Sequence, residues 1–196
     1  LTENAGGQYG NFLITDPNVG VAIDRFQVRF KLEIGGNQAA DGVSFNVAPG
    51  LAISDFTEAG NAPNGVVVSF DTYENGGEEA PAINVKWNNS VIAHRGNLRG
   101  ILPGLGGQGG SAGPTGYQDV YINMDPDGKL DVYFGANVIY NKLQTPFNGF
   151  TGANWGMGAR TGGAFETAYV SDFCINGFAL GPLTFTKDLP ASVPLN

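Results

Sequence analysis

The sequence predicts an all-β protein in which two antiparallel sheets stack face to face, and three observations carry that prediction. Short segments alternate apolar and polar residues with the period of two that a half-buried strand requires. Turn-forming glycine, asparagine, aspartate and proline separate these segments, and glycine alone accounts for 31 of the 196 residues. No window of helical length keeps apolar residues at helical spacing without interruption by glycine or β-branched residues. Short strands with turns at this spacing are typical of a two-layer sandwich.

The length of the chain fits one such sandwich. A β-sandwich of 196 residues is within the usual size of a single unit, so we expect residues 1–196 to form one domain. The chain starts at Leu1 without a methionine, which we interpret as a mature protein or a module of a longer one. The single cysteine, Cys174, excludes an intrachain disulfide. It lies in a strand-like segment, where we expect a buried side chain.

Charge and hydropathy narrow the choice of partner. The formal net charge is −8, the isoelectric point is near 4.4, and the ten Lys and Arg residues are scattered. Nucleic acids and anionic membranes bind proteins through a basic patch, which this sequence lacks. No apolar run approaches the roughly 18 residues that a membrane span needs. We therefore expect no nucleic acid and no membrane insertion, and a neutral or weakly charged ligand is favoured.

The first elements are the clearest strands. Residues 12–14 are apolar within a polar, glycine-rich stretch and predict an edge strand or a packed N-terminal arm. Residues 26–34 alternate strictly, and residues 43–47 alternate again after the turn at Ala40-Asp41-Gly42. Alternation places one set of side chains against a core. The side chains expected there are Phe26, Val28, Phe30, Leu32, Ile34, Val43, Phe45 and Val47.

The central stretch begins at Val66-Val67-Val68, a β-branched run that predicts a strand buried on both faces. A polar, glycine-broken loop follows it. A rigid strand that delivers oxygen ligands and an aromatic ring into one loop can hold a hard cation, a sugar or both. An ordinary acidic hairpin loop is the alternative interpretation. The loop residues concerned are Asp71, Tyr73, Asn75, Glu78 and Glu79.

Two hairpins are predicted after the central stretch. Residues 83–87 and 91–92 flank Asn88-Asn89, which is a tight-turn signal. Residues 120–124 and 130–134 flank Asp125-Pro126-Asp127-Gly128, and this turn explains Asp125 and Asp127 without a bound cation. Further strands are predicted at residues 138–140, 155–158 and 167–175.

Three segments occur in an order that matters for function: Ala40-Asp41-Gly42-Val43-Ser44-Phe45, then Val68-Ser69-Phe70-Asp71-Thr72-Tyr73 with Asn75 and Ile83-Asn84-Val85, then residues 158–167 (GARTGGAFET). Together they make the chain similar to the legume-type (L-type) lectins of the concanavalin A-like class, and closer to bacterial lectin-like modules than to plant lectins. The resemblance implies a jelly-roll sandwich. It also implies a noncatalytic module of a secreted or cell-surface protein that binds a glycan or polysaccharide.

The resemblance also implies roles for single residues. Asp41, preceded by a cis peptide bond, would accept hydrogen bonds from two sugar hydroxyls. Asn75 would bind calcium through its side-chain oxygen and the sugar through its amide nitrogen. Asp71 would be a calcium ligand, and Tyr73 would offer its carbonyl to the ion and its ring to the sugar. Residues 162–165 would set specificity, and the sugar contacts from that loop would be Gly163, Ala164 and Phe165.

The chain also departs from the pattern of that family. Ser69 stands where those lectins place a glutamate, and Ala80 stands near where a metal-binding histidine would be. We therefore expect no transition metal and keep calcium as an open alternative, with Glu78 or Glu79 completing its shell. The only histidine, His94, is expected to be structural.

Two other function classes compete with a binding module. Glycoside hydrolases of the same fold need two carboxylates that face each other across the scissile bond, and no strand here carries such a pair. The chain is therefore not expected to be an enzyme. The alternative to sugar binding is a structural adhesin or surface-assembly module. It would form homo-oligomers through its glycine-rich loops and through residues 1–10 and 183–196.

Overall fold

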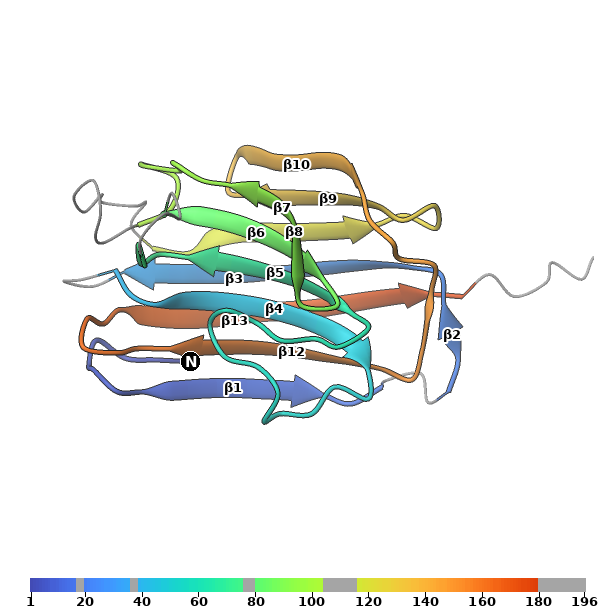
Figure 1. Cartoon of the computed structure of the whole chain (residues 1–196), viewed down its shortest axis with the longest axis horizontal. Helices are drawn as coiled ribbons and strands as arrows, with labels where there is room; N and C mark the ends of the chain where they lie inside the picture. Colours follow the sequence, from blue (N-terminus) through green and yellow to red (C-terminus); the bar gives the residue numbers. More distant parts are fainter. Residues whose placement is uncertain (17–19, 36–38, 76–79, 104–115, 180–196) are drawn as a thin grey trace, which may run out of the picture.

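The computed structural model describes residues 1–16, 20–35, 39–75, 80–103 and 116–179, and every regular element in those ranges is a β-strand. Two large antiparallel sheets and one small one result, and the two large sheets overlie each other along the long axis of the molecule (Figure 1). This confirms the all-β sandwich. The described residues include no helix that could cross a membrane.

The first sheet has six strands. In spatial order they are β1 (Tyr9–Ile14), β12 (Ala153–Arg160), β4 (Gly42–Pro49), β5 (Val66–Asp71), β6 (Ala82–Trp87) and β7 (Ser90–Arg95). The second sheet has five strands. They are β10 (Asn137–Gln144), β9 (Lys129–Phe134), β8 (Gln118–Met124), β3 (Arg25–Gly35) and β13 (Thr167–Phe178). A two-stranded ribbon pairs β11 (Phe150–Thr151) with β2 (Ala22–Ile23).

The core lies between the two large sheets and contains the side chains that alternation predicted. All eight predicted core residues of β3 and β4 are at most 5% exposed. Edge-to-face aromatic contacts join the layers, as where Phe26 of β3 meets Trp155 of β12 with ring centroids 5.2 Å apart. The short strand predicted at residues 12–14 is part of β1, an edge strand as expected.

The outer face of the six-stranded sheet is also covered, in part, by the loop between β4 and β5. Phe56 of this loop packs with Leu51, Ala62 and Val67 in a second apolar cluster, which explains why the Val66–Val68 run is buried on both faces. The loop can lie this close because β12 has glycine beneath it. A Cβ at Gly156 would come within 2.3 Å of the Phe56 ring.

The expectation for Cys174 is wrong, since this cysteine is exposed. Alternation in β13 is interrupted between Ser171 and Cys174, where the pairing with β3 shifts and Asp172 adopts a positive φ of 53°. Such a bulge reverses which residues face the core. Phe173 consequently packs inward, with its ring 5.1 Å from that of Phe12, and Cys174 points outward.

The register fixes which residues share each end of the sandwich. Gly42, at the start of β4, pairs with Asp71 at the end of β5 and with Arg160 at the end of β12. We call this the Asp41 end; β4 starts there, at the left of Figure 1. The opposite end holds the turn between β8 and β9, residues 125–128, and we call it the turn end.

Candidate functional site

The backbone of Asp41 is held between two strand ends. The Ala40–Asp41 peptide bond is cis, as the resemblance implied. The Asp41 N–H donates to the Arg160 carbonyl at 3.0 Å, and the Asp41 carbonyl accepts from the Thr72 N–H at 3.4 Å. The next residue must be glycine: Gly42 has a φ of 131°, and a Cβ there would lie 2.3 Å from the Phe70 carbonyl oxygen. The Asp41 carboxylate is thus presented from a fixed backbone.

The loop after β5 brings its oxygen donors beside this carboxylate. The Tyr73 N–H donates to Oδ1 of Asp71 at 3.1 Å, and Nδ2 of Asn75 donates to the Tyr73 carbonyl at 3.3 Å. Asp41, Asp71 and Asn75 line one pocket of about 400 Å³, a volume within the usual range for small-molecule sites. Three of the residues implied by the resemblance therefore meet in one place.

The loop at residues 162–165 lies beside Asp41, although none of its residues is among those that line the pocket. A Cβ built at Gly162 would lie 3.4 Å from Oδ2 of Asp41, and the Gly162 N–H closes a tight turn on the Ala164 carbonyl at 3.1 Å. Gly163 faces open space. The Phe165 ring lies toward Gly6 of the N-terminal segment, 3.8 Å from where a Cβ on that glycine would be. The structure thus brings Gly162 beside the carboxylate and leaves the predicted contact Gly163 away from it.

The donor chemistry around Asp71 fits a calcium ion in part. Calcium takes six to eight oxygen ligands from carboxylates, amides and carbonyls. The described residues offer one of each, from Asp71, Asn75 and the Tyr73 backbone. They contain no group of three or more His, Cys, Asp or Glu residues that could hold a metal by themselves. The remaining ligands would come from water or from Glu78 and Glu79, which lie outside the described residues.

Sequence reasoning missed the partner of Asp41. Nε of Arg160 lies 3.4 Å from Oδ2 of Asp41, and Nη2 of the same guanidinium lies 2.9 Å from Oε1 of Glu58. Burial raises the pKa of Asp41, the charge of Arg160 opposes that rise, and the charge of Glu58 adds to it. Arg160 is within the segment that carries the resemblance, but nothing in its spacing predicts that Glu58 would reach it.

Glu166 is a second residue that sequence reasoning missed. It is fully buried next to the site, and its Oε2 accepts a hydrogen bond of 2.9 Å from the Thr72 hydroxyl. Within the described part of the chain, Oε1 has no hydrogen-bond partner. Burial raises the pKa of Glu166 to about 8, with the charges of Asp41 and Asp71 adding to the rise and the Thr72 bond opposing it. At neutral pH this carboxyl group is therefore mostly uncharged.

The pocket extends beyond the predicted residues onto the outer face of the six-stranded sheet. Its further lining comprises Glu58, Ala59, Ser69, Asn84, Lys86, Val91 and His94. His94 was expected to be structural, and its ring does hold a neighbour: Nδ1 lies 2.6 Å from Oδ1 of Asn84. The same pair also faces the pocket.

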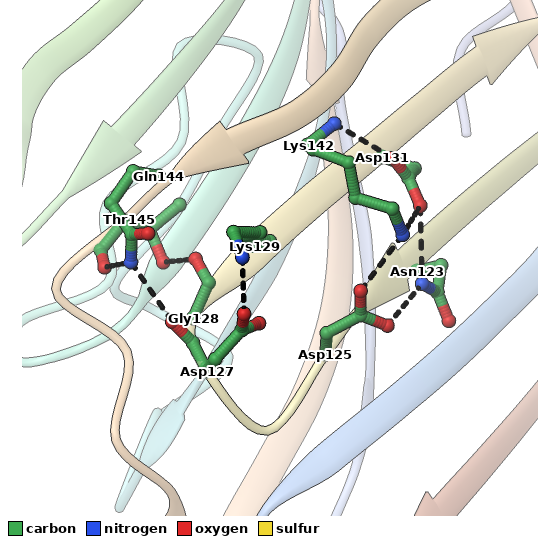
Figure 2. A network of polar contacts seen from close by, with 9 residues as sticks. All are labelled: Asn123, Asp125, Asp127, Gly128, Lys129, Asp131, Lys142, Gln144 and Thr145. Carbon is green, nitrogen blue, oxygen red and sulfur yellow. Dashed lines mark hydrogen bonds and ion pairs between the residues drawn. The ribbon is translucent and has the colours of Figure 1, made fainter.

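The turn end carries a different cluster of carboxylates. Figure 2 shows the Lys142 ammonium between Asp125 and Asp131, 2.8 Å from an oxygen of each. The Asn123 amide donates to the same two carboxylates, at 2.9 and 3.2 Å. The turn itself closes through a 3.0 Å bond from the Gly128 N–H to the Asp125 carbonyl, as the sequence predicted. The chain thus supplies its own cation at this end.

Comparison with solved structures connects this architecture to known proteins. The chain is similar to the exoplasmic/lumenal domain of VIP36 in its Ca²⁺- and mannose-bound form, with a TM-score of 0.63 and 16% identity over 100% of this chain and 84% of that chain. The chain has the fold of the L-type lectins.

Two further L-type lectin structures agree. A Bauhinia forficata lectin in complex with GalNAc gives a TM-score of 0.63 and 15% identity, over 90% of this chain and 82% of that chain. The carbohydrate recognition domain of Emp47p gives 0.62 and 14%, over 90% and 81% of the two chains. No protein-family model and no curated protein sequence matches the chain. At these identities the L-type lectin likeness establishes the fold, and the chemistry has to be argued from the site.

Proposed function

We propose that this chain is a noncatalytic carbohydrate-binding module whose sugar site is at the Asp41 end. The observation that carries the proposal is the meeting of Asp41, Asp71 and Asn75 in one pocket, next to the glycine turn at residues 162–165. A fixed carboxylate accepts hydrogen bonds from two adjacent sugar hydroxyls, and an amide nitrogen donates to a third oxygen. Because the Asp41 backbone is already held, little conformational entropy is lost on binding.

Support also comes from what the structural neighbours bind. VIP36 is described in mannose-bound and Man3GlcNAc-bound forms, and the Bauhinia lectin in complex with GalNAc. These ligands are neutral and rich in hydroxyl groups, as the charge of this chain favours. For this chain we propose a glycan or polysaccharide ligand. We extend the proposal to a secreted or cell-surface context on the strength of the resemblance.

We include calcium as an aid to binding. VIP36 is described in calcium-bound and metal-free forms. In this chain the ion would rest against Asp71, the Tyr73 carbonyl and the oxygen of Asn75. It would fix the amide of Asn75 toward the sugar. Calcium supplies no chemistry beyond this positioning.

The contacts that the pocket carboxylates make with other protein groups support a module without catalysis. A glycosidase needs one carboxyl group as acid and a second as nucleophile or base, facing each other across the scissile bond. In the pocket, Asp41 and Glu58 contact the same guanidinium, and Asp71 accepts the Tyr73 N–H. These side chains are set to hold a ligand.

The assembly alternative lacks support from the N-terminal arm. Thr2 pairs with Ala168, the Leu1 ammonium donates to the Ala168 carbonyl at 2.7 Å, and β1 pairs with β12 of the same chain. Residues 1–10 are thus engaged within their own sandwich. Residues 183–196, the other terminal segment named in that hypothesis, lie outside the described residues.

A glycan array probed in calcium tests the proposal, with Asp41→Ala and Asn75→Ala beside the parent protein. We expect the parent to bind a defined set of glycans. Both variants should lose that binding while keeping the thermal unfolding transition of a folded domain. Binding to no glycan, or unchanged binding by both variants, would overturn the proposed function.

A further inference from the structure

The pocket at the Asp41 end is the open end of a groove that runs along the strands of the six-stranded sheet. Its lining begins at Asp41 and Asp71 and reaches Lys86, which lies four pairs further along the sheet: Asp71 pairs with Ala82, and Val67 pairs with Lys86. Four residues of extended strand span about 13 Å. A single pyranose ring is shorter than that distance. The groove therefore has room for more than one sugar.

A row of polar residues crosses the floor of this groove. The register places Ser44 opposite Ser69, Ser69 opposite Asn84, and Asn84 opposite His94, so that one row runs over four strands. The β4–β5 loop covers the first member, since the Ser44 hydroxyl donates to the Thr57 carbonyl. The rest of the row lines the groove. Polar side chains in a lined hollow are the groups that orient a small hydroxyl-rich ligand.

The Asn84–His94 pair offers matched hydrogen-bonding groups. A carboxamide oxygen only accepts, so the 2.6 Å contact with Oδ1 of Asn84 puts the proton on Nδ1 of His94. With the proton on Nδ1, Nε2 is the atom of this tautomer that accepts, and Nδ2 of Asn84 is a donor. Neither atom has a hydrogen-bond partner among the described residues. A donor and an acceptor side by side suit the paired hydroxyls of a sugar.

The groove is flanked by the β4–β5 loop and by strand β7. Glu58 and Ala59 of the β4–β5 loop form one wall, and Val91 on β7 forms part of the other. The Lys86 ammonium ties the loop to the sheet by donating to the Ala59 carbonyl at 2.8 Å. Carboxylates and the Lys86 ammonium both line this path, so the negative charge of the acidic side chains is partly offset. That mixture favours a neutral ligand.

We propose that the groove binds an extended oligosaccharide, with one sugar at Asp41 and Asn75 and the next over Asn84 and His94. This rests on the proposed function, because the first sugar occupies the site described there. The groove adds the class of ligand to that function: a chain of at least two sugars, and not a single terminal sugar. His94 becomes a specificity residue that acts on the second sugar alone.

Calorimetric titration with ligands of increasing length tests this. The probes are the methyl glycosides of mannose, galactose and GalNAc, each with its di- and trisaccharides. We expect an affinity gain of about tenfold from the monosaccharide to the disaccharide in at least one series, the worth of one or two net hydrogen bonds. His94→Ala should lose this gain and keep the monosaccharide affinity. His94→Gln, which restores a donor and an acceptor, should recover part of it.

Ile92→Ala is the matched control, because Ile92 is exposed on the same strand and does not line the groove among the described residues. It should bind every probe as the parent does. Equal affinity for mono- and disaccharides, or a gain that survives in His94→Ala, would overturn the extended groove while the proposed function stands. Binding of no sugar of any length would overturn both, and the monosaccharide titration tells the two failures apart.

Discussion

At the turn end of the sandwich, Asp125 and Asp131 share the ammonium of Lys142, whereas at the Asp41 end the carboxylates border an open pocket. Both ends gather acidic and amide side chains on strands and on the loops next to them. They differ in what neutralises the charge. Hydrogen bonds from Lys142 lower the pKa of Asp125, and burial raises the pKa of Asp41.

The difference indicates which cluster can bind something. At the turn end, Lys142 and Asn123 occupy the carboxylate oxygens, and the cluster acts as a clamp between β8, β9 and β10. At the Asp41 end, Arg160 contacts one side of Asp41, and the neighbouring Glu166 is buried in its uncharged form. Lys86, the lysine that lines the pocket, donates to the Ala59 carbonyl of the β4–β5 loop, so a ligand or an ion can complete this site.

Titration of Glu166 should give the largest change in the free energy of unfolding, and it tests the electrostatics of the Asp41 end. Its pKa is about 8 in the folded protein and near 4.5 when unfolded, so the folded state holds a proton that the unfolded state releases between these values. The free energy of unfolding should therefore fall as pH rises through this window, by up to about 1.4 kcal/mol per pH unit. Glu166→Gln should flatten the profile. Urea denaturation at several pH values between 5 and 8 measures it.

The matched control for that prediction is Glu3→Gln, since Glu3 is exposed and follows Thr2, whose hydroxyl donates to the Glu166 carbonyl. It should leave the pH profile of the parent unchanged. Parallel profiles for the parent and Glu166→Gln would show that the buried carboxyl does not set the electrostatics of this end.

Calcium binding should give the next largest change in the free energy of unfolding. An ion that binds only the folded state stabilises it by about 2.7 kcal/mol at one hundred times its dissociation constant. Asn75→Ala should lose most of this gain, because it removes one oxygen ligand, and Asn176→Ala on the exposed face of β13 should keep it. Thermal unfolding in calcium and in chelator gives the answer. An equal shift in both variants would place the ion elsewhere.

Lys142→Met should change the free energy of unfolding least of the three. The Lys142 side chain is half exposed, and solvent screens its charge. The variant should be less stable than the parent at neutral pH. Since the pKa of Asp125 is lowered by Lys142, the difference should be present above the ordinary aspartate pKa and vanish as pH falls through the folded value. Urea midpoints at low and high salt measure this.

Lys31→Met serves as its control, because the Lys31–Asp172 pair is exposed on both sides. Exposed pairs of this kind contribute little. If the free energy of unfolding falls equally in both variants, the turn-end cluster contributes no more stability than an exposed ion pair.

The strands could be predicted because their signal is local. Alternation in residues 26–34 and the run at Val66–Val68 specify burial without reference to the rest of the chain. Asp71 and Asn75 could be placed together because they follow one strand, and the ordered resemblance brought Asp41 to them. What failed was non-local: the bulge at Asp172 exposes Cys174, and no sequence pattern announces a bulge.

The unforeseen part of the site has the same origin. Arg160 meets Glu58 only because the β4–β5 loop folds back over the sheet, and Glu166 is buried only because Thr72 and the N-terminal segment close over it. His94 joins Asn84 through pairing between β6 and β7. Each contact depends on packing between segments that are distant in the sequence, or on the exact register of a hairpin.

A crystal structure grown with calcium and a glycan selected on the array tests the central claim most directly. The account predicts a sugar hydrogen-bonded to the Asp41 carboxylate and the Asn75 amide, with an ion against Asp71 and the Tyr73 carbonyl. A sugar bound at the turn end, or anywhere that leaves the Asp41 carboxylate without a ligand contact, would contradict it.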